Sequence, residues 1–261
     1  MSRTYCPLGC VVLLALIVGP VSAETVRVLG MGEAMLAVGN DAGAWWNNVA
    51  LTPLIDVKVP YEQWGAMANA TTSLTDTMDW TSVDVSARSA DGVQGFGAGY
   101  RGGDDWSDVG AGYARRWAPG FTGGVSVGHR SGWGEGTWYT VGLAFGPPVP
   151  ANLVDLRFAA EYWNMTEGGF SQVNLGVGAS WPNGFTVGFD AVDVFDMNAY
   201  DLGAEWVGPE GFKLRGGVMD VFDGTIPTAG VAYALGPWEL GVAWQGLDGD
   251  DYWALGGTGS W

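Results

Sequence analysis

Two kinds of side chain alternate through Leu153-Val154-Asp155-Leu156-Arg157-Phe158-Ala159-Ala160-Glu161-Tyr162-Trp163. The apolar set is Val154, Leu156, Phe158, Ala160 and Tyr162, and the other set is Asp155, Arg157, Ala159 and Glu161. A repeat of two residues is that of a β-strand, because successive side chains of a strand point to opposite faces. Residues 171–181 and 238–245 show the same repeat. Each stretch predicts a strand with one apolar face and one small or polar face.

Similar segments of about nine residues follow one another along the chain and are separated by turn residues, which is typical of a transmembrane β-barrel. We predict an all-β, antiparallel up-and-down barrel of about fourteen strands. The predicted strands start near Leu51, Trp80, Val93, Asp108, Phe121, Trp138, Leu153, Phe170, Phe185, Ala199, Phe212, Thr228, Trp238 and Tyr252.

The links between these segments alternate in chemistry. Every second link is a predicted tight turn rich in proline and glycine, at residues 118–120, 147–150, 181–184, 208–211 and 236–237. The others are acidic or glycine-rich, at residues 102–105, 131–137, 166–169, 193–198, 220–224 and 248–251. By analogy with barrels whose termini lie inside, tight turns should face the periplasm and acidic loops the exterior.

A soluble β-sandwich would also alternate, because each of its sheets has one buried face. A sandwich would leave the second face in water, where the many glycines found at those positions would be an odd choice. A barrel in lipid accounts for an apolar outer face and a narrow, small or charged lumen. We therefore expect Val154, Phe158, Tyr162, Leu240 and Trp244 to face lipid, and Asp155, Arg157, Glu161, Glu239 and Gln245 to face inward.

The N-terminal residues 1–23 have the three parts of a secretory signal peptide: Arg3, an apolar run over residues 11–18, and Val21-Ser22-Ala23 before the expected cleavage. Both cysteines, Cys6 and Cys10, lie within it. A lipoprotein signal is disfavoured, since Cys10 precedes the apolar run instead of following it. We expect a hatch segment over residues 24–50 and the barrel over residues 51–261.

The chain is acidic, with 11 basic and 28 acidic residues. Losing Arg3 with the signal leaves 10 basic and 28 acidic residues, a net charge of −18. Such a charge excludes nucleic acid as a partner. A saline habitat would explain the acidity without any function.

The segment before the first predicted strand carries three short motifs: Gly30-Met31-Gly32-Glu33-Ala34, Ala37-Val38-Gly39-Asn40-Asp41 and Asn47-Asn48-Val49-Ala50-Leu51. In order and spacing they resemble the N-terminal hatch of the outer-membrane fatty-acid transporter (FadL-like) superfamily, most closely its PorV/PorQ-like branch. That family has Asn-Pro-Ala-x-Leu in the third motif, where this chain has Asn48 and Val49. Residues 202–205 and 214–217 also resemble the Leu-Gly-x-Glu and Leu-Arg-x-Gly phrases of a late strand pair in that family.

The resemblance implies a barrel partly plugged by its N-terminal segment. Some members of the superfamily pass hydrophobic compounds, and others serve as platforms for secreted proteins. The hatch residues it implies here are Gly30, Gly32, Ala34, Asp41, Asn47, Asn48 and Leu51. We expect residues 30–51 to form a short plug inside the periplasmic half of the barrel.

Charged residues on the predicted inward faces form a second candidate site. Asp201 and Glu205 on one strand should neighbour Lys213 and Arg215 on the next, because a hairpin sets these faces side by side. Asp155, Arg157 and Glu161 would extend this ladder. A structural ladder of ion pairs is favoured over a selectivity filter.

Signals for catalysis or cofactors are weak. Gly30-x-Gly32 lacks the preceding strand and third glycine of a dinucleotide loop. His129 is the single histidine, which disfavours a Ser/His/Asp triad or a histidine metal centre. The acidic loops lack the spacing of a dedicated calcium site. We expect no enzyme activity, no metal and no cofactor.

Two classes of function remain: a passage for small hydrophobic molecules, and a non-conducting structural or docking barrel such as a secretion-system subunit. The expected location is the bacterial outer membrane. The expected partners are its lipid and, from the aromatic Trp261, the barrel-assembly machinery, with hydrophobic small molecules or a secreted or secretion-system protein as further partners.

Overall fold

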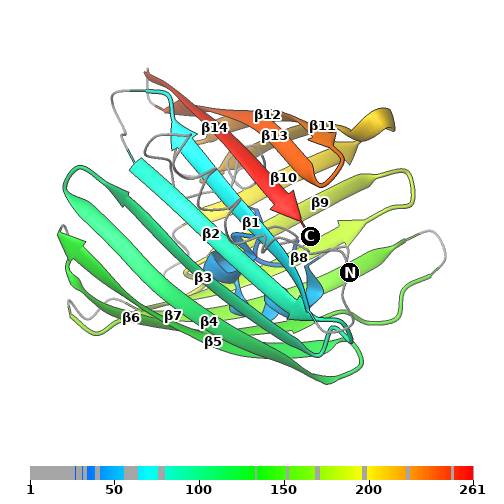
Figure 1. Cartoon of the computed structure of the whole chain (residues 1–261), viewed down its shortest axis with the longest axis horizontal. Helices are drawn as coiled ribbons and strands as arrows, with labels where there is room; N and C mark the ends of the chain where they lie inside the picture. Colours follow the sequence, from blue (N-terminus) through cyan, green and yellow to red (C-terminus); the bar gives the residue numbers. More distant parts are fainter. Residues whose placement is uncertain are drawn as a thin grey trace, which may run out of the picture.

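The computed structural model describes residues 27, 31, 34–38, 42–55, 64–75, 80–132, 134–150, 153–167, 171–195, 199–221, 224–247 and 250–260. Fourteen antiparallel strands form one closed barrel in which every strand pairs with its neighbours in sequence, and β1 pairs with β14 (Figure 1). The strands are β1 Trp64–Ser73, β2 Trp80–Ser89, β3 Gln94–Gly103, β4 Trp106–Ala118, β5 Phe121–Gly132, β6 Gly136–Phe145, β7 Asp155–Met165, β8 Ser171–Ser180, β9 Phe185–Val192, β10 Ala199–Val207, β11 Phe212–Met219, β12 Ile226–Leu235, β13 Trp238–Leu247 and β14 Asp250–Ser260. The predicted fold class is confirmed.

Thirteen of the predicted strand starts lie within two residues of the observed ones. The prediction for the first strand is wrong: Leu51 belongs to the 3-10 helix η1 (Val49–Leu54), and β1 begins at Trp64. The apolar residues of this segment are buried inside the barrel, whereas those of a strand would alternate between the two faces of the wall. Their lack of alternation was the signal for a non-strand conformation.

The two ends of the barrel carry different links. We call the end with residues 90–93, 119–120, 181–184, 208–211 and 236–237 the tight-turn end, and the end with the acidic links the loop end. One predicted tight turn is wrong, because the link between β6 and β7 covers residues 146–154. Its prolines at positions 147, 148 and 150 have no N–H to donate to a hairpin ladder, so the strands separate there.

The alternation of side chains follows the predicted register. Phe158, Tyr162 and Leu240 are 47, 37 and 54% exposed, while Glu161 and Gln245 are each 5% exposed. Val154, which is 63% exposed, lies before β7 and lines a cavity at the end of the barrel, so its exposure does not bear on the register. Large apolar side chains cover the outer surface of the wall, which suits lipid. No helix among the described residues is long and apolar enough to cross a membrane.

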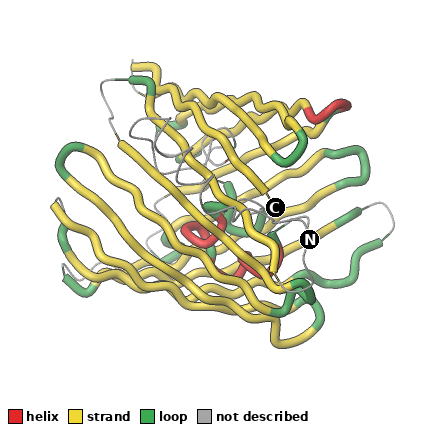
Figure 2. The backbone as a smooth tube through the Cα atoms, in the orientation of Figure 1, coloured by secondary structure: helices red, strands yellow, loops and turns green. Residues whose placement is uncertain are grey.

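The interior of the barrel holds chain that belongs to no strand. Figure 2 shows short helical turns and loops enclosed by the strands. They are the helix α3 (Ala44–Asn47), η1 and their flanking residues. We call residues 31, 34–38 and 42–55 the plug.

Candidate functional site

The plug lies within the lumen, and most of its side chains are buried. Met31, Met35, Trp45, Leu51 and Ile55 are all 0% exposed. The η1 turn contacts the inner faces of β2 to β6, so it lies against one side of the barrel. On the other side, the backbone N–H of Leu36 donates to Asp190 of β9 at 2.7 Å.

Asn48 joins the plug to the wall. Its side-chain oxygen accepts from the N–H of Ala50 at 3.0 Å and thereby caps η1, and its Nδ2 donates to the carbonyl of Leu143 in β6 at 3.1 Å. Asn48 thereby bonds the plug to the barrel, whereas a proline at this position would supply no donor. The side chain is fully buried, so these bonds are shielded from water.

Glycines on the inner wall seat the plug. A Cβ atom added to Gly97 would overlap Trp45, one on Gly112 would meet Val49, and one on Gly142 would overlap the amide oxygen of Asn48. Across the barrel, Gly176 and Gly178 lie under Leu36 and Val38, and Gly188 and Gly203 lie under the carbonyl groups of Ala34 and Met31. Close backbone approach therefore explains why these inward positions carry no side chain. We call these seven glycines the glycine seat.

On the loop-end side of the plug, its tryptophans meet charged and aromatic side chains of the wall. The indole of Trp46 donates to Asp84, and the guanidinium of Arg101 lies 4.2 Å from the centre of the Trp46 ring. Asp108, which is fully buried, accepts from Trp138 at 3.0 Å and from Arg130 at 2.6 Å. The plug thus extends beyond the tight-turn half of the barrel, and our prediction that it is confined there is wrong. The reason is that Trp45 and Trp46 stack toward Trp138 of β6.

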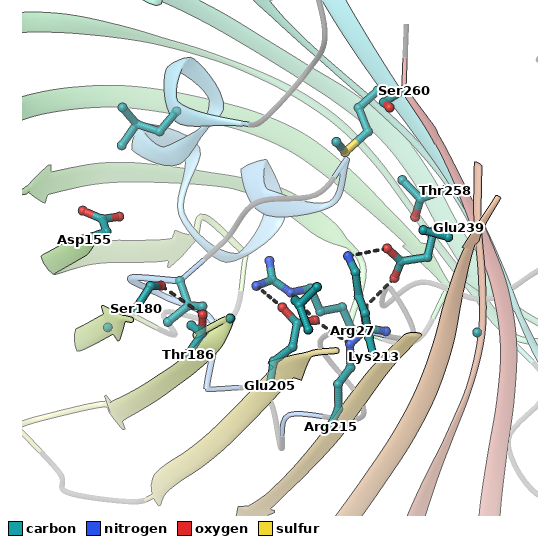
Figure 3. Close-up of a pocket in the computed structure, with 18 of the residues that line it drawn as sticks. Arg27, Asp155, Ser180, Thr186, Glu205, Lys213, Arg215, Glu239, Thr258 and Ser260 are labelled. Atoms are coloured by element: carbon teal, nitrogen blue, oxygen red, sulfur yellow. Dashed lines mark hydrogen bonds and ion pairs between the residues drawn. The ribbon is translucent and has the colours of Figure 1, made fainter. Parts of the chain in front are cut away.

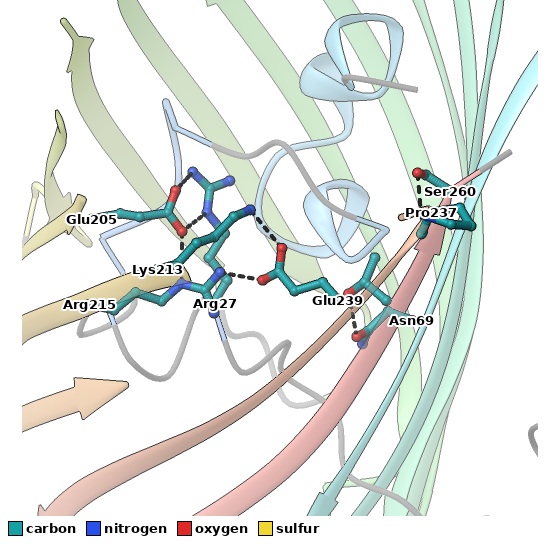
Figure 4. Close-up of polar contacts among 9 residues, drawn as sticks. Arg27, Asn69, Glu205, Lys213, Arg215, Pro237, Glu239 and Ser260 are labelled. Atoms are coloured by element: carbon teal, nitrogen blue, oxygen red, sulfur yellow. Dashed lines mark hydrogen bonds and ion pairs between the residues drawn. The ribbon is translucent and has the colours of Figure 1, made fainter. Parts of the chain in front are cut away.

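A cavity of about 630 Å³ lies at the tight-turn end, between the plug and the wall (Figure 3). Its charged lining consists of Arg27, Asp155, Arg157, Glu205, Lys213, Arg215 and Glu239. Five of these form an alternating ionic chain, which Figure 4 shows: Arg27–Glu205–Arg215–Glu239–Lys213. Arg27 holds both oxygens of Glu205, at 2.9 and 3.1 Å. These ion pairs therefore connect Arg27, which precedes the plug, with strands β10, β11 and β13.

The predicted lumen charges do not all come together. Glu205 and Arg215 are register partners in β10 and β11, and their ion pair measures 2.7 Å. Lys213 instead reaches Glu239 of β13 at 2.6 Å, because side chains from strands two apart converge in a narrow lumen. Placing Asp201 in this ladder is wrong: its side chain lies toward the loop end and accepts from the N–H of Asp220.

The extension of the ladder along β7 is also only partial. Arg157 pairs with Asp155, its neighbour on the same face of the strand. Glu161 lies outside the ladder and accepts from Asn174 of β8 at 3.3 Å. One oxygen of Glu161 and one of Asp190 are buried without a hydrogen-bond partner among the described residues. Glu161 lies four residues further along β7 than Arg157, roughly 13 Å at the rise of a strand, which is too far to join its ion pair.

The implied hatch residues are only partly covered. Ala34, Asn48 and Leu51 are buried in the plug, and Asn47 is half-buried at the end of α3. Gly30, Gly32 and Asp41 lie outside the described residues, as do residues 1–26 and Trp261. His129 is exposed on β5. Among the side chains that the structure describes, no group of three His, Cys, Asp or Glu could hold a metal ion.

Sequence reasoning missed several members of these clusters. The sequence predicts that Glu239 faces inward but does not pair it with Lys213 and Arg215. Arg27 carried no signal, because nothing in a single sequence tells which wall residue an N-terminal arginine meets. The alternation of small residues with charged ones predicts that four further side chains face inward: Asp84, Arg101, Asp108 and Arg130. It does not predict that they lie close together in the barrel.

No protein-family model matches the chain, and no curated protein matches its sequence. Among solved structures, the CymD monoaromatic hydrocarbon channel is similar with a TM-score of 0.59 and 12% sequence identity, covering 91% of this chain and 97% of that one. The Acinetobacter baumannii outer membrane protein Omp33 is similar with a TM-score of 0.56 and 13% identity, covering 77% of this chain and 98% of that one. At these identities the likeness establishes the fold. The closed barrel with its apolar exterior is that of an outer-membrane β-barrel protein, and the bacterial outer membrane is its location.

Proposed function

We propose that this barrel is a plugged passage for small hydrophobic molecules. The observation that carries the proposal is that the plug occupies the lumen but contributes no strand to the wall. Its hydrogen bonds to the barrel, such as those of Leu36 and Asn48, lie outside the fourteen-strand pairing, so the plug can rearrange while that ladder stays intact. CymD, a monoaromatic hydrocarbon channel with a similar fold, supports this class of solute.

We further propose that the chain is a divergent member of the FadL-like superfamily, from its PorV/PorQ-like branch, and that it is not an enzyme. The support comes from the three N-terminal motifs and from the burial of Ala34, Asn48 and Leu51 within the lumen. The two late phrases lie on the adjacent strands β10 and β11 and supply Glu205 and Arg215.

The test is a deletion of residues 30–46 in protein reconstituted into liposomes. Migration of unboiled protein in gels first establishes that the variant has assembled. We expect uptake of a hydrophobic dye or a fatty acid to rise several-fold over that of the intact protein. Gly203→Ala, which drives a methyl group against the plug, should raise uptake less, and Gly216→Ala should leave it unchanged because its nearest neighbour is 3.9 Å away.

A docking barrel that passes nothing is the second candidate, with a secreted or secretion-system protein as partner. The complete burial of Met31, Met35 and Trp45 favours it, because such a dry plug is costly to move. Negligible uptake by an assembled deletion variant would reject the passage and favour this function. The loop-end segments near Asp193 and Asp251 are the first surfaces on which to seek the partner.

A further inference from the structure

The tight-turn cavity has a charged lining and would not be the binding site of a neutral hydrophobic solute, so it calls for a ligand of its own. Four cationic side chains, Arg27, Arg157, Lys213 and Arg215, and three carboxylates, Asp155, Glu205 and Glu239, line it. Its formal charge is therefore +1 in a chain whose net charge is −17. Covering these groups with an apolar solute would remove their hydration without replacing it.

Two of the cations keep N–H donors that no described residue accepts. The guanidinium of Arg157 has five N–H groups, and its hydrogen bond to Asp155 uses one of them. The ammonium of Lys213 has three, and its bond to Glu239 uses one. The side chains of Arg157 and Lys213 are only 16 and 22% exposed and both line the cavity. Their remaining N–H groups are therefore directed into the cavity and not into open solvent.

One neutral donor completes the lining. The hydroxyls of Ser180 and Thr186 share a hydrogen bond of 3.0 Å on the β8–β9 side of the cavity, which leaves one of their two O–H groups to donate to a ligand (Figure 3). Arg157 and Lys213 come from β7 and β11, so the available donors stand on different walls. A ligand with two separated acid groups could engage both walls at once.

Acidic and basic side chains are distributed unequally between the two ends of the barrel, and this predicts the end at which an anionic ligand enters. The described residues at and near the loop end include Asp104, Asp105, Asp108, Glu135, Glu167, Asp193, Asp201, Asp220 and Asp251, against Arg101 and Arg130. Toward the tight-turn end lie Arg27, Arg88, Arg115, Arg116, Arg157, Lys213 and Arg215, against Asp91, Asp155, Glu205, Glu210 and Glu239. An anion is thus repelled at one mouth and attracted at the other.

We propose that the tight-turn cavity binds a small organic dianion, such as a dicarboxylate, that enters from the tight-turn side. Arg157 and Lys213 bind the two acid groups, and the remaining O–H of the Ser180–Thr186 pair adds a neutral hydrogen bond. A volume of about 630 Å³ is that of a small-molecule site, for which roughly 300–1,000 Å³ is usual. The site stands independently of whether the barrel conducts.

The test is isothermal titration of the full protein in detergent with succinate, with acetate as the single-charge probe. We expect succinate to bind more tightly than acetate, and Arg157→Gln to weaken succinate binding at least tenfold. The matched control is Arg115→Gln, which removes the same charge at the same end of the barrel from an exposed residue on β4 outside the cavity. It should leave the affinity within twofold.

Asp155→Asn gives an independent measurement, because it releases Arg157 from its partner without removing a cation. We expect succinate affinity to rise several-fold in this variant. The proposal is overturned if wild-type protein binds no succinate, if Arg115→Gln weakens binding as much as Arg157→Gln, or if Asp155→Asn leaves the affinity unchanged in protein that migrates as a folded barrel.

Discussion

Asp108 is the carboxylate that holds together Arg101, Arg130 and Trp138 on the loop-end side of the plug. It is fully buried and accepts from Arg130 and Trp138, with Arg101 3.4 Å away. Asp108→Ala would leave two guanidinium groups facing each other, and we expect a loss of unfolding free energy of at most about 3–5 kcal/mol, since both arginines keep some contact with water. Urea unfolding in lipid vesicles measures it. Asp108→Asn, which still offers an oxygen to Trp138, should lose less; equal losses would show that charge is irrelevant here.

Val231 and Ala234 of β12 test which face of the wall meets lipid. Val231 is 48% exposed near the middle of the strand, and we expect Val231→Arg to cost roughly 2–4 kcal/mol. Ala234 lines the cavity opposite Glu239 in register, so Ala234→Arg should cost less. Unfolding free energies in vesicles provide the comparison, and a larger cost at Ala234 would contradict the assigned faces.

The plug and its glycine seat behave as a pair of complementary elements. Gly188→Ala and Gly203→Ala place a methyl group against the carbonyl groups of Ala34 and Met31, so we expect each to lower the unfolding free energy by about 1–3 kcal/mol. Gly216→Ala, on the same β10–β11 hairpin as Gly203, should change it little because the described atom nearest to the new methyl group is 3.9 Å away. Equal changes of unfolding free energy in all three variants would show that the glycine seat makes no specific contribution to stability.

At the scale of the whole molecule, the closed ladder predicts behaviour on gels. Because β1 pairs with β14, the barrel has no open edge and should resist detergent until boiled. We expect a heat-modifiable, β-rich protein in the outer-membrane fraction. Recovery in the soluble periplasm would contradict a barrel in lipid.

The orientation of the barrel is a separate prediction. Single cysteines at Glu135 and Asp251, at the loop end, should react with an impermeant maleimide on intact cells. A cysteine at Asn183, in the tight turn between β8 and β9, should react only after the outer membrane is permeabilised. The opposite pattern would reverse the direction assigned to the charge gradient.

The sequence by itself determined the barrel, its strand number and the faces of its strands. Each of these follows from local information: a period of two, turn residues at regular intervals, and apolar side chains on one face. It also indicated that residues 30–51 are not wall, although the first strand was placed too early. The pairing of Glu205 with Arg215 was readable for the same reason, because the two strands form one hairpin.

Only the tertiary structure decided what fills the lumen and which charges meet there. The glycines at 97, 176, 188 and 203 look alike in sequence, yet each is small because a particular part of the plug approaches it. Arg27 and Glu205 are 178 residues apart, and Lys213 bonds to Glu239 across an intervening strand. Such contacts depend on barrel closure and strand tilt, which bring remote inward-facing side chains together in a narrow lumen and leave no local trace in the sequence.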